Sequence, residues 1–277
     1  MAALLPLQKT VYDSRLDKAS RLKSLLPPAP PGSLGQLPKG LFLFDDALFS
    51  VVYAPLDHIN PGARIVLAGL TPSWRQTQAA YAAHAELAGH DEEHAGFEIK
   101  RRAAFCGSMR ANVIEMLDAL SVHSCLGMDS TEALFGAQAH ALHATHVLRY
   151  PVFKGGKSYS GQNPRPAGHA FLRAMLERVC APELERVPDA LIVPLGKAAE
   201  EGLEHLSELG LLNRQRWLRG FPHPSAANGR RKTEFARARA ELEWQVQAWF
   251  SRGSLPPPRW NGEWQNADAG RSLAVSM

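Results

Sequence analysis

The stretch Arg64-Ile65-Val66-Leu67-Ala68-Gly69 is a continuous apolar run that ends in glycine. Such a run is typical of a strand that is buried on both faces of a parallel sheet. Similar runs occur at Thr145–Tyr150 and Ala190–Gly196, and Trp217-Leu218-Arg219 has the character of the end of a further short strand. Helical patterns separate these segments. We therefore expect a three-layer α/β/α sandwich around a four-stranded, mostly parallel central sheet.

Amphipathic patterns predict the helices that cover this sheet. Helices are expected over 108–120, 167–180, 197–209 and 233–250. The polar segment 74–103, rich in Ala, His and Glu, predicts a solvated helix and loop. Pro151–Pro166 is expected to be a long irregular loop, which inside a compact domain is typical of a functional or mobile segment.

The two ends of the chain differ in composition from the middle. Residues 1–26 alternate apolar and charged side chains, which suits a short amphipathic helix, and Pro27–Gly40 has five prolines and three glycines. We therefore divide the chain into an N-terminal helix and proline-rich linker (1–40), one α/β domain (41–252) and a disordered tail (253–277).

Composition limits the classes of function. The net charge of +4 and a pI of about 9.0 suit a polyanionic partner. The three cysteines, Cys106, Cys125 and Cys180, form no CxxC pair, so neither a disulfide framework nor a zinc site is indicated. No stretch of 18 apolar residues occurs. We expect a monomeric cytoplasmic protein without a membrane segment.

Two histidine-containing stretches are candidates for chemistry. His90 and His94 lie four residues apart, but spacing fixes no third ligand, so we expect no metal site. Gly220–Gly229 contains His223-Pro224-Ser225, and the prolines on both sides of the imidazole stiffen the backbone. Because this segment follows a predicted strand, it falls where open α/β sheets place ligands.

Four segments, in chain order, resemble the uracil-DNA glycosylase superfamily. They are Gly69-Leu-Thr-Pro-Ser, Phe105-Cys-Gly-Ser-Met-Arg, Leu191-Ile-Val-Pro-Leu-Gly-Lys-Ala-Ala and His223-Pro224-Ser225. The resemblance spans about residues 64–250. It implies a monofunctional glycosylase that flips a base out of DNA and hydrolyses its N-glycosidic bond without a cofactor.

The resemblance also implies roles for single residues. His223 would hydrogen-bond the departing base, Phe105 would stack on the flipped base, and Ser73 and Ser225 would grip phosphates. A packed histidine and a core phenylalanine are the plain alternatives for His223 and Phe105. Lys157, Asn228, Arg230 and Arg231 are further candidates for DNA binding.

Cys180-Ala-Pro-Glu-Leu184 is similar to a segment that supplies an iron–sulfur ligand in one branch of the superfamily. Tyr150 stands where another ligand cysteine would be, and no N-terminal cysteine pair exists. We therefore expect no iron–sulfur cluster, with Cys180 as a small buried hydrophobe. Tyr150 is instead a candidate for the base-binding group.

The chain departs from the family's first motif. Where the family brings a side chain that orients or activates water, this chain has Leu70 and Thr71. The hydroxyl of Thr71 can hold a water but is a poor base, and it is our catalytic candidate beside His223. Asp91, Glu93 and Glu98, in the segment that follows, are the candidate carboxylates that would serve in its place.

Two further departures concern how DNA is read. The family reads uracil with an asparagine amide, and this chain offers His146, which cannot present a donor and an acceptor to a pyrimidine edge in the same way. Ala227 is too small for the apolar wedge that relatives insert into the duplex, so Asn228 or Arg230 would fill the gap.

These departures favour a pocket remodelled for a modified pyrimidine, such as a hypermodified cytosine of phage DNA, in an antiviral defence role. A divergent repair glycosylase for uracil or another deaminated base is an alternative. A non-catalytic DNA-binding module of the same fold, and an unrelated α/β hydrolase or nucleotide enzyme, are others.

Overall fold

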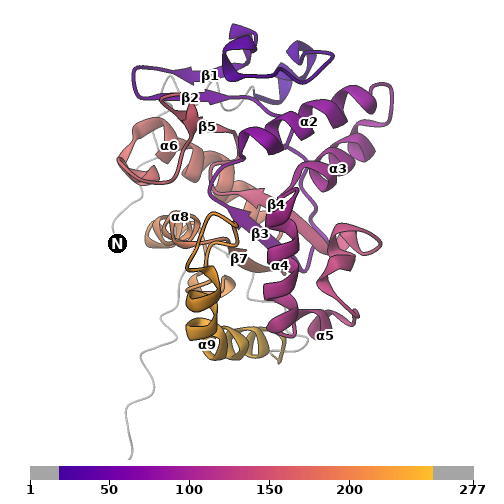
Figure 1. The fold of residues 1–277 in the computed structure, drawn as a ribbon, viewed down its shortest axis with the longest axis vertical. Helices are drawn as coiled ribbons and strands as arrows, with labels where there is room; N and C mark the ends of the chain where they lie inside the picture. The colour runs from indigo at the N-terminus through magenta and orange to yellow at the C-terminus, as the bar shows by residue number, and fades with distance from the viewer. Residues whose placement is uncertain (1–18, 252–277) are drawn as a thin grey trace, which may run out of the picture.

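A three-stranded parallel sheet lies at the centre of the computed structural model, which describes residues 19–251 (Figure 1). The middle strand β3 (Ile65–Gly69) pairs in parallel with β4 (Leu142–His146) on one side and with β7 (Leu191–Pro194) on the other. Every residue of these strands is buried. The apolar runs in the sequence therefore mark strands covered on both faces, as predicted.

The expected fourth strand is reduced to a single parallel bridge between Ile192 and Trp217. The backbone turns away directly afterwards, because Gly220 has a φ of 79° and Pro222 has no N–H for a ladder. The predicted strand over 145–150 also differs from the structure, since β4 begins at Leu142 and ends at His146.

A second, antiparallel sheet has the strand order β1-β2-β5-β6. Its strands are β1 (Phe42–Asp45), β2 (Phe49–Val52), β5 (Val152–Lys154) and β6 (Lys157–Ser158). The prediction of an irregular loop over 151–166 was therefore wrong for its first half, which is a hairpin. Gly155 and Gly156, with φ of 54° and 73°, form the two-residue turn that such a hairpin requires.

Helices surround the parallel sheet. They are α2 (Trp74–Glu86), α3 (Glu92–Ala103), α4 (Ser108–Ala119), α5 (Val122–Leu126), α6 (Ala170–Met175), α7 (Ala181–Glu185), α8 (Lys197–Glu208) and α9 (Arg231–Ser251). The polar segment 74–103 thus forms two helices, with Asp91 accepting a hydrogen bond from the His94 amide at the start of α3. A π-helical turn, Leu176–Cys180, joins α6 to α7.

Alternate residues of β3 enter two different hydrophobic clusters. Val66 and Ala68 belong to a cluster with residues of α2, α3, α6 and α8, whereas Ile65 and Leu67 belong to a cluster with residues of α4, α5 and α9. The period of two along the strand explains this division. Both faces of the parallel sheet are therefore packed against helices.

The segment before the first sheet lies partly against the domain. A 3₁₀ helix covers Ala19–Leu25, and Leu37 of the proline-rich segment and Leu41, which follows that segment, are buried in the core. Most of the helix predicted over 1–26, and the tail predicted over 253–277, lie outside the described residues. Between residues 19 and 251 no helix combines the length and the apolar character needed to cross a membrane.

Candidate functional site

The carboxyl ends of the three parallel strands bring chemistry-bearing residues to one edge of the sheet. His146 ends β4 opposite Gly69, which ends β3, and Gly196 follows β7 by two residues. The His-Pro-Ser loop reaches the same edge, because the Cα and Cβ of His223 lie close to Gly196. A Cβ built on Gly196 would stand 2.7 Å from the His223 Cβ. Gly196, at a φ of 93°, is therefore the position that lets this histidine approach the sheet.

His223 is held in one tautomer. The Ser225 amide donates to its Nδ1 at 3.2 Å, so Nδ1 accepts and the proton of the neutral ring lies on Nε2. Loss of water around the ring lowers the pKa of His223 below its usual value. Although close to Gly196, the residue as a whole is exposed. The loop therefore presents a neutral imidazole with an N–H donor directed away from its own backbone.

Neighbouring side chains fix the loop around His223. Asn112 of α4 donates to the Pro224 carbonyl at 2.7 Å, and the Arg231 guanidinium donates to the same carbonyl at 3.3 Å. Asn228 donates to the His223 carbonyl at 3.2 Å and to Glu234 at 3.0 Å. The Asn228 amide is thus engaged within the loop. Arg231 also helps to hold the loop in place, and its guanidinium lies 3.9 Å from the Glu115 carboxylate.

His146 and Phe105 lie against each other beside Gly69. Their ring centroids are 5.1 Å apart, and a Cβ on Gly69 would stand 2.6 Å from the His146 Cδ2. Burial, with a smaller effect of Lys100, lowers the pKa of His146 to about 3, so its imidazole is neutral near pH 7. No hydrogen bond to the ring nitrogens of His146 is found among the described residues.

Phe105 adopts a strained backbone, with a φ of 50° at a fully buried side chain. Left-handed geometry is uncommon for a bulky residue and costs about 1 to 3 kcal/mol, so it persists where surrounding contacts over-determine it. Gln76 accepts from the Phe105 amide at 3.3 Å. The strained backbone of Phe105 therefore lies where its ring packs against His146 and where both rings approach Gly69 closely.

Thr71 has a structural partner on each side of its hydroxyl. The hydroxyl donates to the Tyr150 carbonyl at 3.1 Å and accepts from the Val152 amide at 2.9 Å. Leu70, the other first-motif position, packs against Gly161 of the loop beyond β6. The hydroxyl of Thr71 therefore joins the two sheets, which leaves it little capacity to orient a water.

The carboxylates expected near the first motif are also engaged. Glu98 forms ion pairs with Arg101 at 2.8 Å and Arg102 at 3.4 Å, and Asp91 caps α3. Glu93 is exposed and lies 3.4 Å from His58. Within residues 19–251, none of these three contacts the His223 loop in any hydrogen bond or ion pair.

The remaining predicted residues fall into three places. Ser73 caps α2 by accepting from the Gln76 amide at 3.3 Å, and Ser225 accepts from the Ala227 amide at 3.1 Å. Lys157 is exposed on β6. Tyr150 is buried, and its hydroxyl donates to Asp57 at 2.8 Å. The structure therefore brings Ser225 to His223, whereas the Tyr150 hydroxyl belongs to a separate polar cluster.

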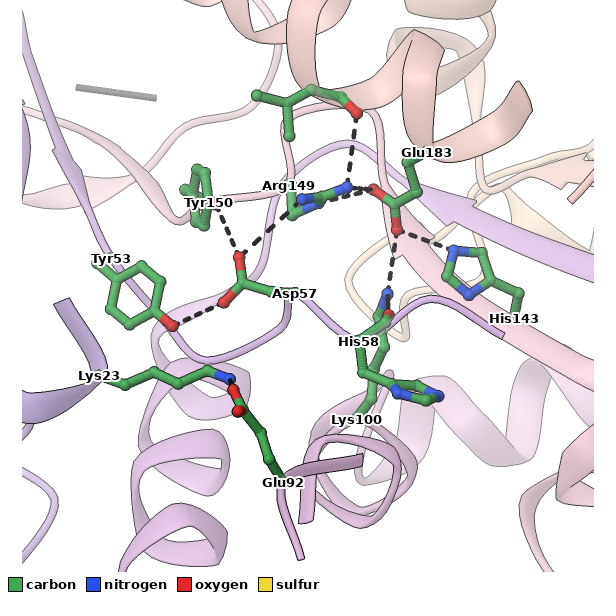
Figure 2. A network of polar contacts seen from close by, with 11 residues as sticks. Lys23, Tyr53, Asp57, His58, Glu92, Lys100, His143, Arg149, Tyr150 and Glu183 are labelled. Carbon is green, nitrogen blue, oxygen red and sulfur yellow. Dashed lines mark hydrogen bonds and ion pairs between the residues drawn. The ribbon is translucent and has the colours of Figure 1, made fainter. Parts of the chain in front are cut away.

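That separate cluster, the buried charge network, is shown in Figure 2. The Glu183 carboxylate lies at its centre and receives Lys100 at 3.0 Å, Arg149 at 2.7 Å and His143 at 2.8 Å. Burial alone would raise the pKa of Glu183, but Arg149 and Lys100 hold it well below its usual range. Burial lowers the pKa of His143 to about 4. The carboxylate is ionised, with Arg149 and Lys100 beside it, although burial lowers the pKa of Lys100.

Asp57 forms the second half of the network. It accepts from Tyr53 at 2.6 Å and from Tyr150 at 2.8 Å, and Arg149 lies 4.0 Å away. Arg149 therefore links the two carboxylates, since it contacts both Asp57 and Glu183. Because Arg149 and Tyr150 follow the end of β4 at His146 after two intervening residues, the network anchors the chain soon after it leaves the candidate site.

Sequence reasoning did not identify Asn112, Gly196 or Arg75 as site residues. A Cβ on Gly107 would meet the Arg75 guanidinium at 2.9 Å, so this cation lies at the start of α4, where no side chain caps the helix. The signal for Gly196 is present in the sequence, because a glycine directly after an apolar strand often permits a close approach. Asn112 offers no such signal.

Metal ligands do not gather in the described part of the chain, where no group of three or more His, Cys, Asp or Glu side chains has the geometry to hold an ion. His90 and His94 have ring centroids 6.0 Å apart and are exposed. Cys180 is buried, and burial raises the pKa of its thiol. It therefore packs as a hydrophobic side chain.

Comparison with known proteins finds one related sequence. The chain is 39% identical over 202 residues to YoxB of Bacillus subtilis (strain 168), an uncharacterized protein. The aligned region covers 72% of this chain and 79% of YoxB. No protein-family model matches the chain, and no solved structure matches it.

Proposed function

The chain belongs to the family of YoxB, and we propose that it is a monofunctional DNA glycosylase that hydrolyses the N-glycosidic bond of a flipped, modified pyrimidine. A hypermodified cytosine of phage DNA is the favoured base, in a defence role in the cytoplasm, with the enzyme acting as a monomer. The observation that carries the proposal is the His223 tautomer, because Nδ1 is engaged by the Ser225 amide while no group in residues 19–251 hydrogen-bonds the Nε2–H.

The chemistry needs a donor for the departing base. Breaking the bond leaves negative charge on the base, and a preorganised neutral donor stabilises that charge as it develops. A lowered pKa keeps the His223 ring neutral, so Nδ1 continues to accept from Ser225. Rigid anchoring of the loop by Asn112 supports this role, because it holds the donor in place before the base arrives.

The pocket for the base is proposed at His146 and Phe105. The buried neutral imidazole of His146 and the buried ring of Phe105, whose backbone is strained, lie at the same strand ends, and a base that entered between them would meet a stacking surface and a single-proton hydrogen-bonding group. The asparagine that the uracil-specific family uses is missing at this position. A base other than uracil therefore suits the site better.

DNA contacts are proposed on both sides of the His223 loop. Arg230 and Lys232 are exposed at the start of α9, and Arg75 lies at the uncapped start of α4, where a helix N-terminus favours phosphate. Arg231 contributes less, because it holds the Pro224 carbonyl. Replacing Arg230 and Lys232 with Ala should flatten the salt dependence of DNA binding by about two units of slope. An unchanged slope would remove them from the interface.

The wider architecture proposed is a three-layer α/β/α sandwich, with the Ile192–Trp217 bridge as the remnant of a fourth strand. The two hydrophobic clusters that share β3 support this description, because each includes helices from one face. In such folds ligands bind beyond the carboxyl ends of the strands. The position of His223 agrees with that rule.

An abasic-site assay tests the proposal. The protein, its His223→Ala variant and the control His140→Ala, at an exposed histidine without a hydrogen-bonded side chain in residues 19–251, are incubated with hypermodified phage DNA, uracil-containing DNA and unmodified DNA. Alkali then cleaves any abasic sites. We expect breaks in the hypermodified DNA only, lost in His223→Ala and retained in the control. Breaks in uracil-containing DNA alone would assign the protein to ordinary base repair.

A non-catalytic DNA-binding module is the second candidate. The specific observation in its favour is that the Thr71 hydroxyl has a partner on each side and that no carboxylate stands at the first motif. On that account no DNA is broken, and His223→Ala leaves DNA affinity unchanged. Base release by the unmodified chain would eliminate it.

A further inference from the structure

A groove of about 400 Å³ lies between the segment 214–220, which leads into the His223 loop, and the second half of α9. The α9 residues that line it share one face of the helix, because they are three or four positions apart: Glu241, Trp244, Gln245, Ala248 and Trp249. At 1.5 Å per residue this face is about 12 Å long. The groove therefore runs along α9, beside the entry to the His223 loop.

Indole rings line much of the groove. Trp217 and Trp249 belong to its walls together with Trp244. Among the large apolar residues between 19 and 251, Trp244 is the most exposed, at 65%. An exposed aromatic face in a groove is a platform on which a planar ring can stack. The groove therefore suits a ligand that carries flat aromatic groups.

The groove also has an unpaired hydrogen-bond donor. Trp217 is only 3% exposed, and its Nε1 has no hydrogen-bond partner within the described residues. Native proteins rarely leave a buried N–H without a partner. Because Trp217 lines the groove, a ligand that brings an oxygen acceptor can supply that partner. Phosphate oxygens and the carbonyl oxygens of bases are acceptors of this kind.

The charges along the groove favour an anion. Arg214 and Arg219 line it and are exposed, and neither forms an ion pair in the part of the chain that the structure describes. Glu241 is the carboxylate among the lining residues, and it accepts from Gln245 at 3.3 Å. Arg219 also interacts electrostatically with Glu200 of α8, so Arg214 is the less compensated cation. Two guanidinium groups beside one carboxylate leave a positive excess.

The groove is fixed close to the His223 loop. Gln245 of α9 holds the Arg219 backbone, because it accepts from the Arg219 amide at 2.8 Å and donates to the Arg219 carbonyl at 3.3 Å. Gly220 lines the groove and precedes His223 by three residues, so the two are at most about 11 Å apart. This distance corresponds to about three nucleotides at the 3.4 Å spacing of a stacked strand. One DNA strand can therefore reach both the groove and His223.

We propose that this groove binds single-stranded DNA beside the flipped base. The proposal rests on the glycosylase function proposed above, because it places the strand relative to His223. Trp244 stacks on a base, and Arg214 and Arg219 bind phosphates. The Trp217 Nε1 donates to an oxygen of the strand. Aromatic platforms beside cations bind single strands with little dependence on sequence, because every base has a face that can stack.

Fluorescence anisotropy of the full chain with a labelled 12-nucleotide oligo(dT), and with its duplex with oligo(dA), tests the proposal. We expect Trp244→Ala to weaken single-strand binding at least five-fold and duplex binding less than two-fold, while Trp244→Phe keeps single-strand binding within three-fold. Arg214→Ala should lower the salt slope of single-strand binding by about 0.7, the value for one phosphate. Leu209→Ala and Arg173→Ala, at exposed positions outside the groove, are the controls and should change neither quantity.

Base release by the same variants separates this inference from the proposed activity. His223→Ala should abolish release and leave single-strand binding within two-fold. Single-strand binding that Trp244→Ala weakens, without base release by the unaltered chain, would support the groove and refute the glycosylase. Binding unchanged in both Trp244→Ala and Arg214→Ala would refute the groove, even if bases are released. A dimer that sedimentation detects and Trp244→Ala dissociates would identify a second copy as the occupant and overturn the assignment.

Discussion

The buried charge network and the candidate site lie on neighbouring parts of the same sheet, and they treat their polar groups in opposite ways. In the network, Glu183 has three charged or hydrogen-bonding partners and Asp57 has two tyrosine donors. At the site, the Nε2 of His223 and the ring nitrogens of His146 have no hydrogen-bond partner among the described residues. Polar groups whose hydrogen bonds are all made within the protein stabilise the fold. Fixed groups that still have a free donor or acceptor are available to bind a ligand.

Figure 2 also shows an exposed ion pair, Lys23–Glu92, beside the buried charge network. The Lys23–Glu92 pair has a short separation of 2.6 Å, yet the side chain of Glu92 is 84% exposed. Solvent screens such a pair, so distance alone says little about its contribution. Burial decides which carboxylate the fold depends on.

The largest effect on stability is expected at Glu183. Replacing it with Gln leaves Lys100 and Arg149 buried without their counter-ion, which should lower the free energy of unfolding by about 3 to 5 kcal/mol. Urea denaturation measures the change. Glu92→Gln is the control and should leave the free energy of unfolding nearly unchanged, because solvent screens this pair. Equal effects of the two variants would contradict the distinction between saturated interior and screened surface.

A smaller effect is expected from pH. The pKa values of His143 and His146 are lowered to about 4 and about 3 in the folded protein, from a usual value near 6.5. The unfolded chain therefore binds more protons below pH 6.5, so stability falls as the pH is lowered from 6.5 towards 4. At pH 5 each histidine should cost about 2 kcal/mol relative to pH 7.

Urea denaturation at pH 7 and pH 5 measures this loss, and His146→Asn should reduce it by about 2 kcal/mol. The depressed carboxylate Glu183 does not interfere, because its stabilisation is lost only below the unfolded value near 4.5. Stability that is constant between pH 7 and 5 would show that these imidazoles are not held neutral by burial.

The smallest effect on stability, with a large effect on the site, is expected at Gly196. A methyl group there would stand 2.7 Å from the His223 Cβ, and a φ of 93° is unfavourable for alanine. Gly196→Ala should cost about 1 to 2 kcal/mol and displace the His223 loop. Gly229→Ala, where no atom lies within 4 Å of the new Cβ, is the control. Base release retained in Gly196→Ala would argue against a precise placement of His223.

The sequence was sufficient to predict β3, β7 and most helices, because their periodicity is local, whereas the strand expected over 145–150 forms over 142–146 instead. The apolar run around Leu67 predicted β3, and the predicted helix over 108–120 was confirmed as α4. The antiparallel hairpin of β5 and β6 was missed, since its two-residue turn at Gly155 lies in a polar stretch. A fourth strand was predicted where Gly220 and Pro222 end the ladder.

The candidate site was predicted only in part, for the same reason. The place of His223 after the last strand segment follows from local patterns, whereas His146, expected near the start of a strand over 145–150, instead ends β4. The buried charge network does not follow from local patterns, because Lys100 and Glu183, which pair in it, are 83 residues apart in the chain. The partners of the Thr71 hydroxyl are likewise set by tertiary structure, about 80 residues away.

The most direct test of the account is the single-turnover rate of base release from hypermodified phage DNA by the unaltered protein and by His223→Ala, with unfolding measured on the same preparations. The account predicts a loss of at least about 100-fold in rate, as expected when a catalytic donor or acid is removed, and a change in stability within about 1 kcal/mol. An unchanged rate, or no base release by the unaltered protein, would contradict it.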